Sequence, residues 1–184
     1  MFLKRLWAFF LDILEVVVFA VAIFLFVYLL IVQPHKIKGT SMEPNFPSGE
    51  YLLTDKVSYR FREPKRGEII VFMAPTSNSD EFIKRIIALP GETIMIENES
   101  IYINGQLLNE PYLSYNINTL PGNFLQENDA MTIPFNNYFV MGDNRPFSSD
   151  SRSWGYVPKE NITGRAWFIY WPLGSIGLIK DISY

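Results

Sequence analysis

The chain has 184 residues, of which 48% are hydrophobic and 16% aromatic, and it carries a net charge of −3. This length allows one domain of ordinary size together with a membrane anchor, since domains most often need about 100–150 residues. The charge balance gives no reason to expect a nucleic-acid partner, which would favour a basic face. Because there is no cysteine, a thiol nucleophile, disulfides and cysteine-rich zinc sites are excluded, and the redox compartment stays undetermined.

A long apolar run near the amino terminus predicts a membrane anchor. Val16–Val32 contains 17 residues without a charge, and extending it back to Ile13 across Glu15 gives 20 residues. A helix of about 20 residues rises ~30 Å, which matches one hydrocarbon thickness. A cleavable signal peptide is the alternative, but its apolar region spans roughly 7–15 residues and ends in small residues. The run is followed instead by polar and bulky residues, so we expect an uncleaved anchor.

The orientation of this anchor does not follow from its flanking charges. Lys4 and Arg5 precede the run, whereas Lys36 and Lys38 follow it. The positive-inside count barely favours a cytoplasmic amino terminus, and charge alone does not settle the question.

Beyond His35 the sequence predicts a mainly β domain. Apolar runs of strand length are separated by glycine, proline and asparagine turn signals, and no later segment has a convincing helical period. One pair of runs predicts a hairpin with its turn at Glu97–Ser100. The expected strands are Tyr51–Leu53, Glu68–Phe72, Phe82–Ala88, Thr93–Ile96, Ile101–Ile103, Tyr138–Met141 and Arg165–Trp171.

The segment 109–132 differs in composition from these strands, because it is polar and contains two prolines. It predicts a peripheral region inserted on the β core and more mobile than its flanks. We therefore divide the chain into an anchor over residues 1–34 and a catalytic β domain over residues 35–184, with the inserted region around 98–134.

Ser41 follows the anchor closely, within the stretch GTSMEPNFPSGE. A serine becomes a nucleophile only when a base removes its proton. The single histidine, His35, lies between the anchor and Lys36 and is better interpreted as an interfacial residue than as that base. The surrounding residues also do not form the G-x-S-x-G elbow. By itself, Ser41 is better explained as a turn residue than as a nucleophile.

Lys84 is a candidate base. Side chains alternate along a strand, so Phe82, Lys84 and Ile86 share one face of the predicted strand Phe82–Ala88. Apolar neighbours disfavour the ammonium form and lower the pKa of the amine. Most lysines are solvated surface groups, so this argument alone leaves both interpretations open.

The third constellation is MGDNRPFSSDSRSWGYVP, residues 141–158, which is dense in aspartate, arginine and serine. Such residues often form polar turns by bonding to their own backbone, and the pattern is a poor match to a calcium loop. A functional interpretation is a scaffold in which Asp143 pairs with Arg85 and a serine hydroxyl orients a buried amine.

Taken together, these stretches resemble the type I signal peptidases. The resemblance rests on an amino-terminal membrane segment followed in order by S-M-x-P (41–44), K-R-I-I-A-L-P-G (84–91) and G-D-N-R-x-x-S-x-D-S-R-x-x-G (142–155). It covers about residues 7–172 and is closest to the smaller bacterial members. The resemblance implies an antiparallel β-sheet, partly open and barrel-like, outside the membrane, and no metal or other cofactor.

The resemblance also implies roles for individual residues. Ser41 matches the nucleophile, Lys84 the general base, and Ser148 the serine that hydrogen-bonds the lysine amine. Gly39 stands where some members have a serine whose hydroxyl serves in the oxyanion hole, so the second oxyanion donor is open, with a backbone group of Gly39 as a candidate. The residues expected to brace the site are Arg85, Asp143, Asp150 and Arg152, and those expected near the substrate pockets are Ile37, Met42, Phe46, Phe82 and Ile83.

These expectations describe a single-pass plasma-membrane enzyme with a cytoplasmic amino terminus and an extracytoplasmic catalytic domain. Its partners would be secretory precursor proteins and the lipid bilayer. Two alternatives remain: a self-cleaving repressor, against which the anchor and the G-D-N-R motif argue, and an inactive membrane-tethered β module retained for binding. Within the motif, Pro146 and Phe147 replace residues that are often polar in the family.

Overall fold

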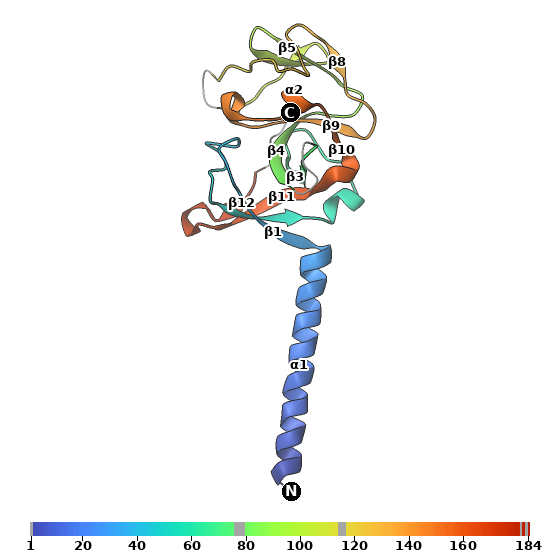
Figure 1. Ribbon diagram of the computed structural model, residues 1–184, viewed down its shortest axis with the longest axis vertical. Coiled ribbons are helices and arrows are strands. Elements are labelled where there is room, and N and C mark those ends of the chain that lie inside the picture. Colours follow the sequence, from blue (N-terminus) through green and yellow to red (C-terminus); the bar gives the residue numbers. More distant parts are fainter. Residues whose placement is uncertain (1, 76–79, 114–116, 181, 183) are drawn as a thin grey trace.

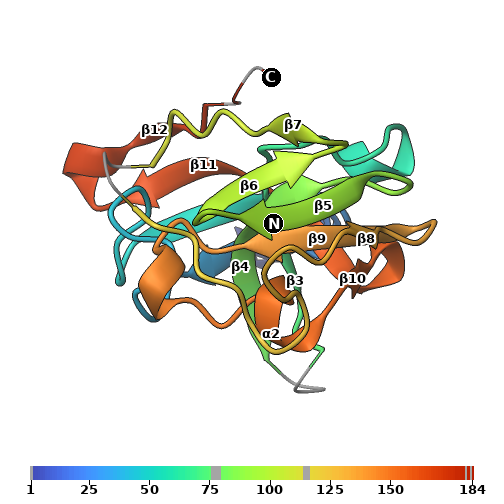
Figure 2. The same cartoon turned by 90° about the horizontal axis from the view of Figure 1, so that it is seen from above.

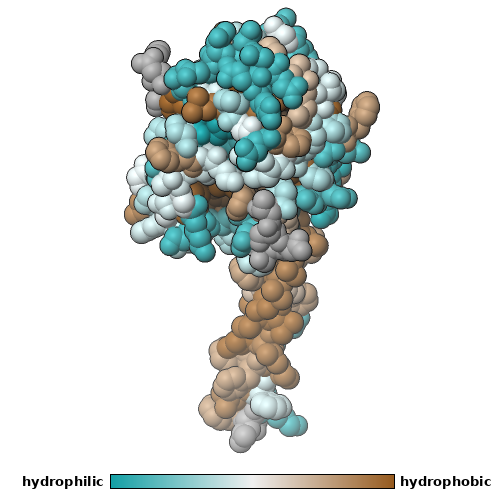
Figure 3. Space-filling model, turned by 45° about the horizontal axis from the view of Figure 1, so that its top comes forward, coloured by the Kyte–Doolittle hydropathy of each residue, from teal (hydrophilic) through white to brown (hydrophobic). Residues whose placement is uncertain are grey.

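The computed structural model of the chain describes residues 2–75, 80–113, 117–180, 182 and 184. It consists of a long amino-terminal helix, α1 (Phe2–Leu30), and a β domain placed at the end of that helix (Figure 1). Apolar side chains cover α1, whereas the visible surface of the domain is mainly polar (Figure 3). Within the described residues, one helical segment, Lys4–Leu30, is long and apolar enough to cross a membrane. Its 27 residues correspond to a rise of about 40 Å.

The larger sheet has eight strands, and all their pairings are antiparallel. In the described part of the chain its first and last strands do not pair with each other, so the sheet is open and does not form a closed barrel. The path runs through β1 (Val32–Lys36), β2 (Tyr51–Asp55), β11 (Ile162–Trp171), β3 (Ile69–Met73), β4 (Glu81–Ala88), β9 (Asn137–Met141) and β10 (Val157–Pro158), and β12 (Gly177–Leu178) pairs with β11.

A smaller antiparallel sheet lies on the side of the domain away from α1 (Figures 1 and 2). The hairpin predicted around Glu97–Ser100 is present, and Asn98 and Glu99 adopt left-handed backbone conformations, with φ of 48° and 60°. Such conformations match the twist of a tight two-residue turn. The sheet contains β7 (Gln106–Leu107), β6 (Ser100–Ile103), β5 (Thr93–Glu97) and β8 (Met131–Thr132).

The seven predicted strands are confirmed, each within a few residues of its expected bounds. Five short strands were not predicted. One of them, β1, begins two residues after α1 ends and carries His35, so the chain turns directly from the helix into the sheet. Pro34 lacks an N–H group and is tolerated there because β1 is an edge strand. The remaining four, β7, β8, β10 and β12, have two residues each, too few for alternation to reveal.

The segment expected as an insertion contributes to both the smaller sheet and the core. Leu125 is fully buried, and with Ile94, Ile96 and Phe139 it belongs to the hydrophobic cluster between the two sheets. Two further clusters line the larger sheet, one around Ile70 and Val140 and the other around residues 37–52. Strand β4 is therefore buried among these clusters from Lys84 to Ala88.

The remaining helical segments of the described chain are short. They are η1 (Ser58–Arg60), η2 (Arg145–Phe147), α2 (Ser151–Trp154), η3 (Lys159–Asn161) and η4 (Leu173–Ser175). Helix α2 is a single turn whose amino terminus is capped by Asp150, because the Asp150 carboxylate accepts a hydrogen bond from the Arg152 N–H.

Candidate active site

Pairing of β4 with β9 brings three distant segments together. Arg85 on β4 stands opposite Met141 on β9, so the loop that begins at Gly142 lies beside Lys84. The loop that carries Ser41 is attached to this second loop, because the Asn144 N–H donates to the Ser41 carbonyl at 3.0 Å. The Asn144 side chain also donates to the Thr40 carbonyl at 3.0 Å. The sheet register and these two hydrogen bonds therefore set the distance between Ser41 and Lys84.

Gly142 makes this approach possible. A Cβ atom at this position would lie 2.3 Å from the Ser41 carbonyl oxygen and 2.3 Å from the Ser148 Oγ. Both distances are far below van der Waals contact, so a larger residue would push the two loops apart. The first glycine of the 142–155 motif is thus required for close packing rather than for an unusual backbone angle.

Ser41 and Lys84 are in direct contact. The Lys84 Nζ lies 2.9 Å from the Ser41 Oγ and 3.1 Å from the Ile83 carbonyl oxygen. The Lys84 residue is only 4% exposed, and its Nζ lies 5.2 Å from the centre of the Phe82 ring. Burial lowers the pKa of the Lys84 amine from 10.5 to about 8, against the opposing effect of the Asp150 and Asp143 carboxylates. A neutral amine placed on a serine hydroxyl can accept its proton.

Arg85 and Asp143 form the ion pair expected from the sequence. The Arg85 Nε and one terminal nitrogen lie 2.8 Å and 2.6 Å from the two Asp143 oxygens, and both side chains are almost fully buried. The Tyr112 ring stacks 3.9 Å from the Arg85 guanidinium carbon. Asn45 donates to Asp143 at 2.8 Å and to the Tyr112 carbonyl at 2.9 Å. This pair therefore joins β4, the Ser41 loop and the segment around Tyr112.

Asp150 and Arg152 form a second buried pair further along the chain, at the start of α2. The Arg152 Nε donates to Asp150 at 2.8 Å, and a terminal nitrogen donates to the Arg145 carbonyl at 2.7 Å. The Gly142 N–H also donates to Asp150, at 3.2 Å. These contacts hold both ends of the 142–150 loop, so the four residues expected to brace the site all contact that loop.

Sequence reasoning missed a third buried pair, Arg145 with Glu110. The Arg145 side chain is completely buried and donates to Glu110, to Thr119 at 2.7 Å and to the Tyr112 hydroxyl at 3.1 Å. Arg145 lies in the 142–155 motif, but nothing in the local pattern around Glu110 indicates its partner, 35 residues away. The segment expected as a mobile insertion thus contacts the site loop directly through Glu110, Tyr112 and Thr119.

The hydrogen bond expected from Ser148 to the Lys84 amine is absent from the structure. The Ser148 Oγ is buried and has no hydrogen-bond partner among the described residues. Lys84 is instead bonded to Ser41 and to the Ile83 carbonyl. The reason is local: the Ser148 hydroxyl packs against Gly142, close to the Ser41 carbonyl oxygen.

A groove of about 500 Å³ opens onto Ser41 and Lys84. Its walls are formed by residues 35–41 and by the first half of β4, which includes Phe82 and Ile83. Ile37, Phe82 and Ile83 therefore lie where the sequence predicted. Met42 and Phe46 do not line the groove; they are 1% and 6% exposed and belong to the hydrophobic cluster beneath it. In the loop that carries Ser41, these two apolar side chains are therefore buried, whereas Ser41 stays partly exposed.

Gly39 and Ser41 both line this groove. Gly39 has φ of +86°, which disfavours a side chain although a Cβ there would meet no atom within 4 Å. Among the described residues, the Ser41 N–H has no hydrogen-bond acceptor. His35, also on the groove wall, bonds to Thr54 and Glu81 at 2.9 Å and 2.7 Å rather than to Ser41. No group of three or more acidic or histidine side chains in the described residues is placed to hold a metal ion.

Comparisons with known proteins agree on one family. Residues 10–171 match the family described as signal peptidase, peptidase S26. Probable signal peptidase I-2 of Synechocystis sp. is 38% identical over 156 residues, covering 82% of this chain and 68% of the relative. Signal peptidase IB of Staphylococcus aureus strain COL is 33% identical over 175 residues, covering 88% of this chain and 91% of the relative.

A crystal structure of a signal peptidase I from Enterococcus faecalis V583 is also similar. It is 37% identical in sequence, with a TM-score of 0.48, and the match covers 56% of this chain and 97% of that one. The family match spans most of the chain, and it includes every residue that builds the groove and its three ion pairs. The chain therefore belongs to the signal peptidase family, peptidase S26, and is a peptide-bond hydrolase of the signal peptidase I type.

Proposed function

We propose that this chain is a membrane-bound serine endopeptidase that removes amino-terminal signal peptides from secretory precursors through a Ser–Lys dyad. The observation that carries the proposal is the 2.9 Å contact between the Ser41 Oγ and the Nζ of the buried Lys84. The sole histidine is bonded elsewhere, so Lys84 is the base available to Ser41. The bracing pairs Arg85–Asp143 and Asp150–Arg152 hold β4 and the 142–150 loop beside this contact.

In the first half of the reaction, Ser41 is acylated. The neutral Lys84 amine takes the Ser41 proton as Oγ attacks the scissile carbonyl carbon. The resulting oxyanion accepts a hydrogen bond from the unpaired Ser41 N–H, with a Gly39 backbone group as the candidate second donor. As the carbon–nitrogen bond breaks, the Lys84 ammonium returns a proton to the leaving amine. Loss of one oxyanion donor typically costs about 10²–10³ in turnover.

In the second half, water releases the signal peptide. The Lys84 amine removes a proton from water, the hydroxide attacks the ester carbon, and the Ser41 oxygen leaves with the proton held by Lys84. Ser148 is proposed to contact the amine when substrate is bound, because no described residue bonds to its buried hydroxyl. Catalytic hydrogen bonds often tighten only in the substrate complex.

The substrate is proposed to bind as an added strand in the groove. Residues 81–84 of β4 pair with β3, but β9 joins β4 only from Arg85 onward, so no described strand pairs with their other edge. An extended peptide can bond to such an edge, with alternate side chains facing apolar surfaces. Ile37, Phe82 and Ile83 supply those surfaces.

We further propose that α1 crosses the plasma membrane once, with a cytoplasmic amino terminus and the β domain outside. Its length of about 40 Å exceeds the ~30 Å hydrocarbon thickness. Anchoring would place the groove near cleavage sites that emerge at the membrane surface, which raises their effective concentration.

Four single substitutions in the full chain test the dyad on a purified secretory precursor. Ser41→Ala and Lys84→Ala should each lower cleavage by at least about 10³-fold, as loss of a dyad member does in serine hydrolases. The exposed Ser153→Ala and Lys65→Ala provide matched controls and should cleave normally. Substantial cleavage by either dyad variant would refute the mechanism. An acylating serine probe that fails to label Ser41 in the folded wild type would favour an inactive binding module instead.

A further inference from the structure

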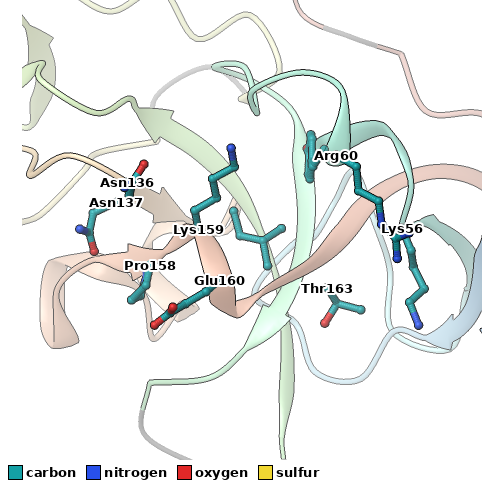
Figure 4. A pocket seen from close by; sticks show the side chains of 10 residues that line it. Lys56, Arg60, Asn136, Asn137, Pro158, Lys159, Glu160 and Thr163 are labelled. Carbon is teal, nitrogen blue, oxygen red and sulfur yellow. The ribbon is translucent and has the colours of Figure 1, made fainter. Parts of the chain in front are cut away.

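A second hollow, of about 770 Å³, shares no lining residue with the groove. Figure 4 shows this hollow from close by. Its cationic side chains come from three segments: Lys56 follows β2, Arg60 ends η1, and Lys159 begins η3. In Figure 4, Lys56 and Arg60 lie on one side of the hollow and Lys159 on the other. Tyr59, Pro158 and Ile162 also line it, so the hollow combines apolar and cationic surface.

The hollow begins where α1 ends. The Lys56 Nζ donates to the Leu29 carbonyl at 3.0 Å, and the Lys56 N–H donates to the Ile31 carbonyl at 3.0 Å. Leu29 belongs to the last turn of α1. Beyond the hydrocarbon core, each headgroup layer of a bilayer is only about 5–7 Å thick. If α1 spans the hydrocarbon, Lys56 therefore lies at headgroup depth, and η1 follows directly from it.

The charges around the hollow favour an anion. Three cations line it against one carboxylate, Glu160, which is exposed. Lys159 is paired at 2.5 Å with Glu63, whose side chain is 68% exposed. Arg60 is exposed, and its guanidinium has no ion-pair or hydrogen-bond partner among the described residues. An unpaired guanidinium beside a lysine is the arrangement that binds a phosphate well.

We infer that this hollow binds the headgroup phosphate of an anionic membrane phospholipid. Lys56 and Arg60 contact the phosphate, and the apolar surface of Tyr59 and Ile162 takes the adjoining glycerol. A lipid is favoured over free phosphate because the hollow is joined to the end of α1 and has apolar as well as cationic walls. The inference rests on the proposed membrane position of α1 but not on the proposed chemistry at Ser41.

The test is a lipid titration of the full chain in detergent, read by native mass spectrometry. Phosphatidylglycerol is the probe, phosphatidylcholine the zwitterionic comparison, and soluble glycerol phosphate the competitor. Arg60→Gln removes one unpaired surface charge, and Lys65→Gln removes an exposed charge outside the hollow as a matched control. Circular dichroism and cleavage activity check that each variant is folded, so a loss of binding is not confused with unfolding.

We expect wild type to retain one phosphatidylglycerol in preference to phosphatidylcholine. A cation near an anionic membrane surface contributes ~1 kcal/mol, so Arg60→Gln should weaken binding about fivefold. Lys56→Gln combined with it should weaken binding about 25-fold, and Lys65→Gln should bind as wild type does. Equal effects of Arg60→Gln and Lys65→Gln, or no effect of Arg60→Gln, would overturn the inference. Glycerol phosphate that binds as tightly as the lipid would overturn it too. Because binding is read without cleavage, none of these outcomes bears on the peptidase.

Discussion

The proposed dyad predicts a specific dependence of activity on pH. Only neutral Lys84 can accept the Ser41 proton, and burial lowers the pKa of this amine to about 8. About 9% of the amine is then neutral at pH 7 and about 91% at pH 9. Activity should therefore rise with pH, by about tenfold between pH 7 and pH 9, and level off above that.

The assay measures kcat/KM of the full chain in detergent from pH 6 to pH 10. The substrate is a signal-peptide segment without groups that titrate in this range, so the profile reports the free enzyme. A profile that is flat over this range, or that still rises with a midpoint near the ordinary lysine value of 10.5, would refute a buried lysine base. A midpoint near pH 6.5 would indicate histidine instead.

The same pKa shift predicts how stability varies with pH. The unfolded chain has Lys84 at its ordinary pKa of 10.5 and the folded chain at about 8, so the unfolded state binds more protons between these values. The free energy of unfolding should therefore rise with pH in this window, by about 3 kcal/mol from this one group. Below pH 8 the folded chain carries the full cost of burying the charged Lys84 ammonium. Lys84→Met should thus be more stable than wild type near pH 7, and the difference should shrink towards pH 10.5 in paired chemical denaturations.

Three further substitutions test the surroundings of the dyad. Glu110→Gln leaves Arg145 buried without its carboxylate, so the free energy of unfolding, measured by thermal denaturation, should fall by about 3–5 kcal/mol. An unchanged free energy of unfolding would mean that the pair does not stabilise the fold. Gly142→Ala forces a Cβ to within 2.3 Å of the Ser41 carbonyl oxygen, and kcat/KM should fall by about 10² or more as the two loops separate. Retained activity would show that the loops can shift without consequence. Ser148→Ala removes a buried hydroxyl without a partner, so the melting temperature should hold while kcat falls about 10–100-fold. An unaltered kcat would remove Ser148 from the proposed mechanism.

Much of the site could be anticipated from residues that are near one another in sequence. The alternation of Phe82, Lys84 and Ile86 placed the lysine in apolar surroundings, and the structure buries it. The Arg85–Asp143 pair was also expected, because the motifs carry both partners. The expected bond from Ser148 to Lys84 is not formed in this structure, and Met42 and Phe46 lie in the core beneath the groove rather than along its walls. The local sequence pattern shows that a side chain is apolar. It does not show whether that side chain lines the groove or packs into the hydrophobic core beneath it.

The sequence by itself determined the class of the protein: a long apolar run specifies a helix able to span a membrane, and alternating apolar residues specify the strands that follow. Only the tertiary structure decided which groups meet. Contact between Ser41 and Lys84 depends on the register of β4 with β9 and on the space left by Gly142. The burial of Arg145 against Glu110 joins segments with no common local signal. Such contacts follow from packing of the whole domain, because close approach, burial and the pKa of Lys84 are set by neighbours far away in the chain.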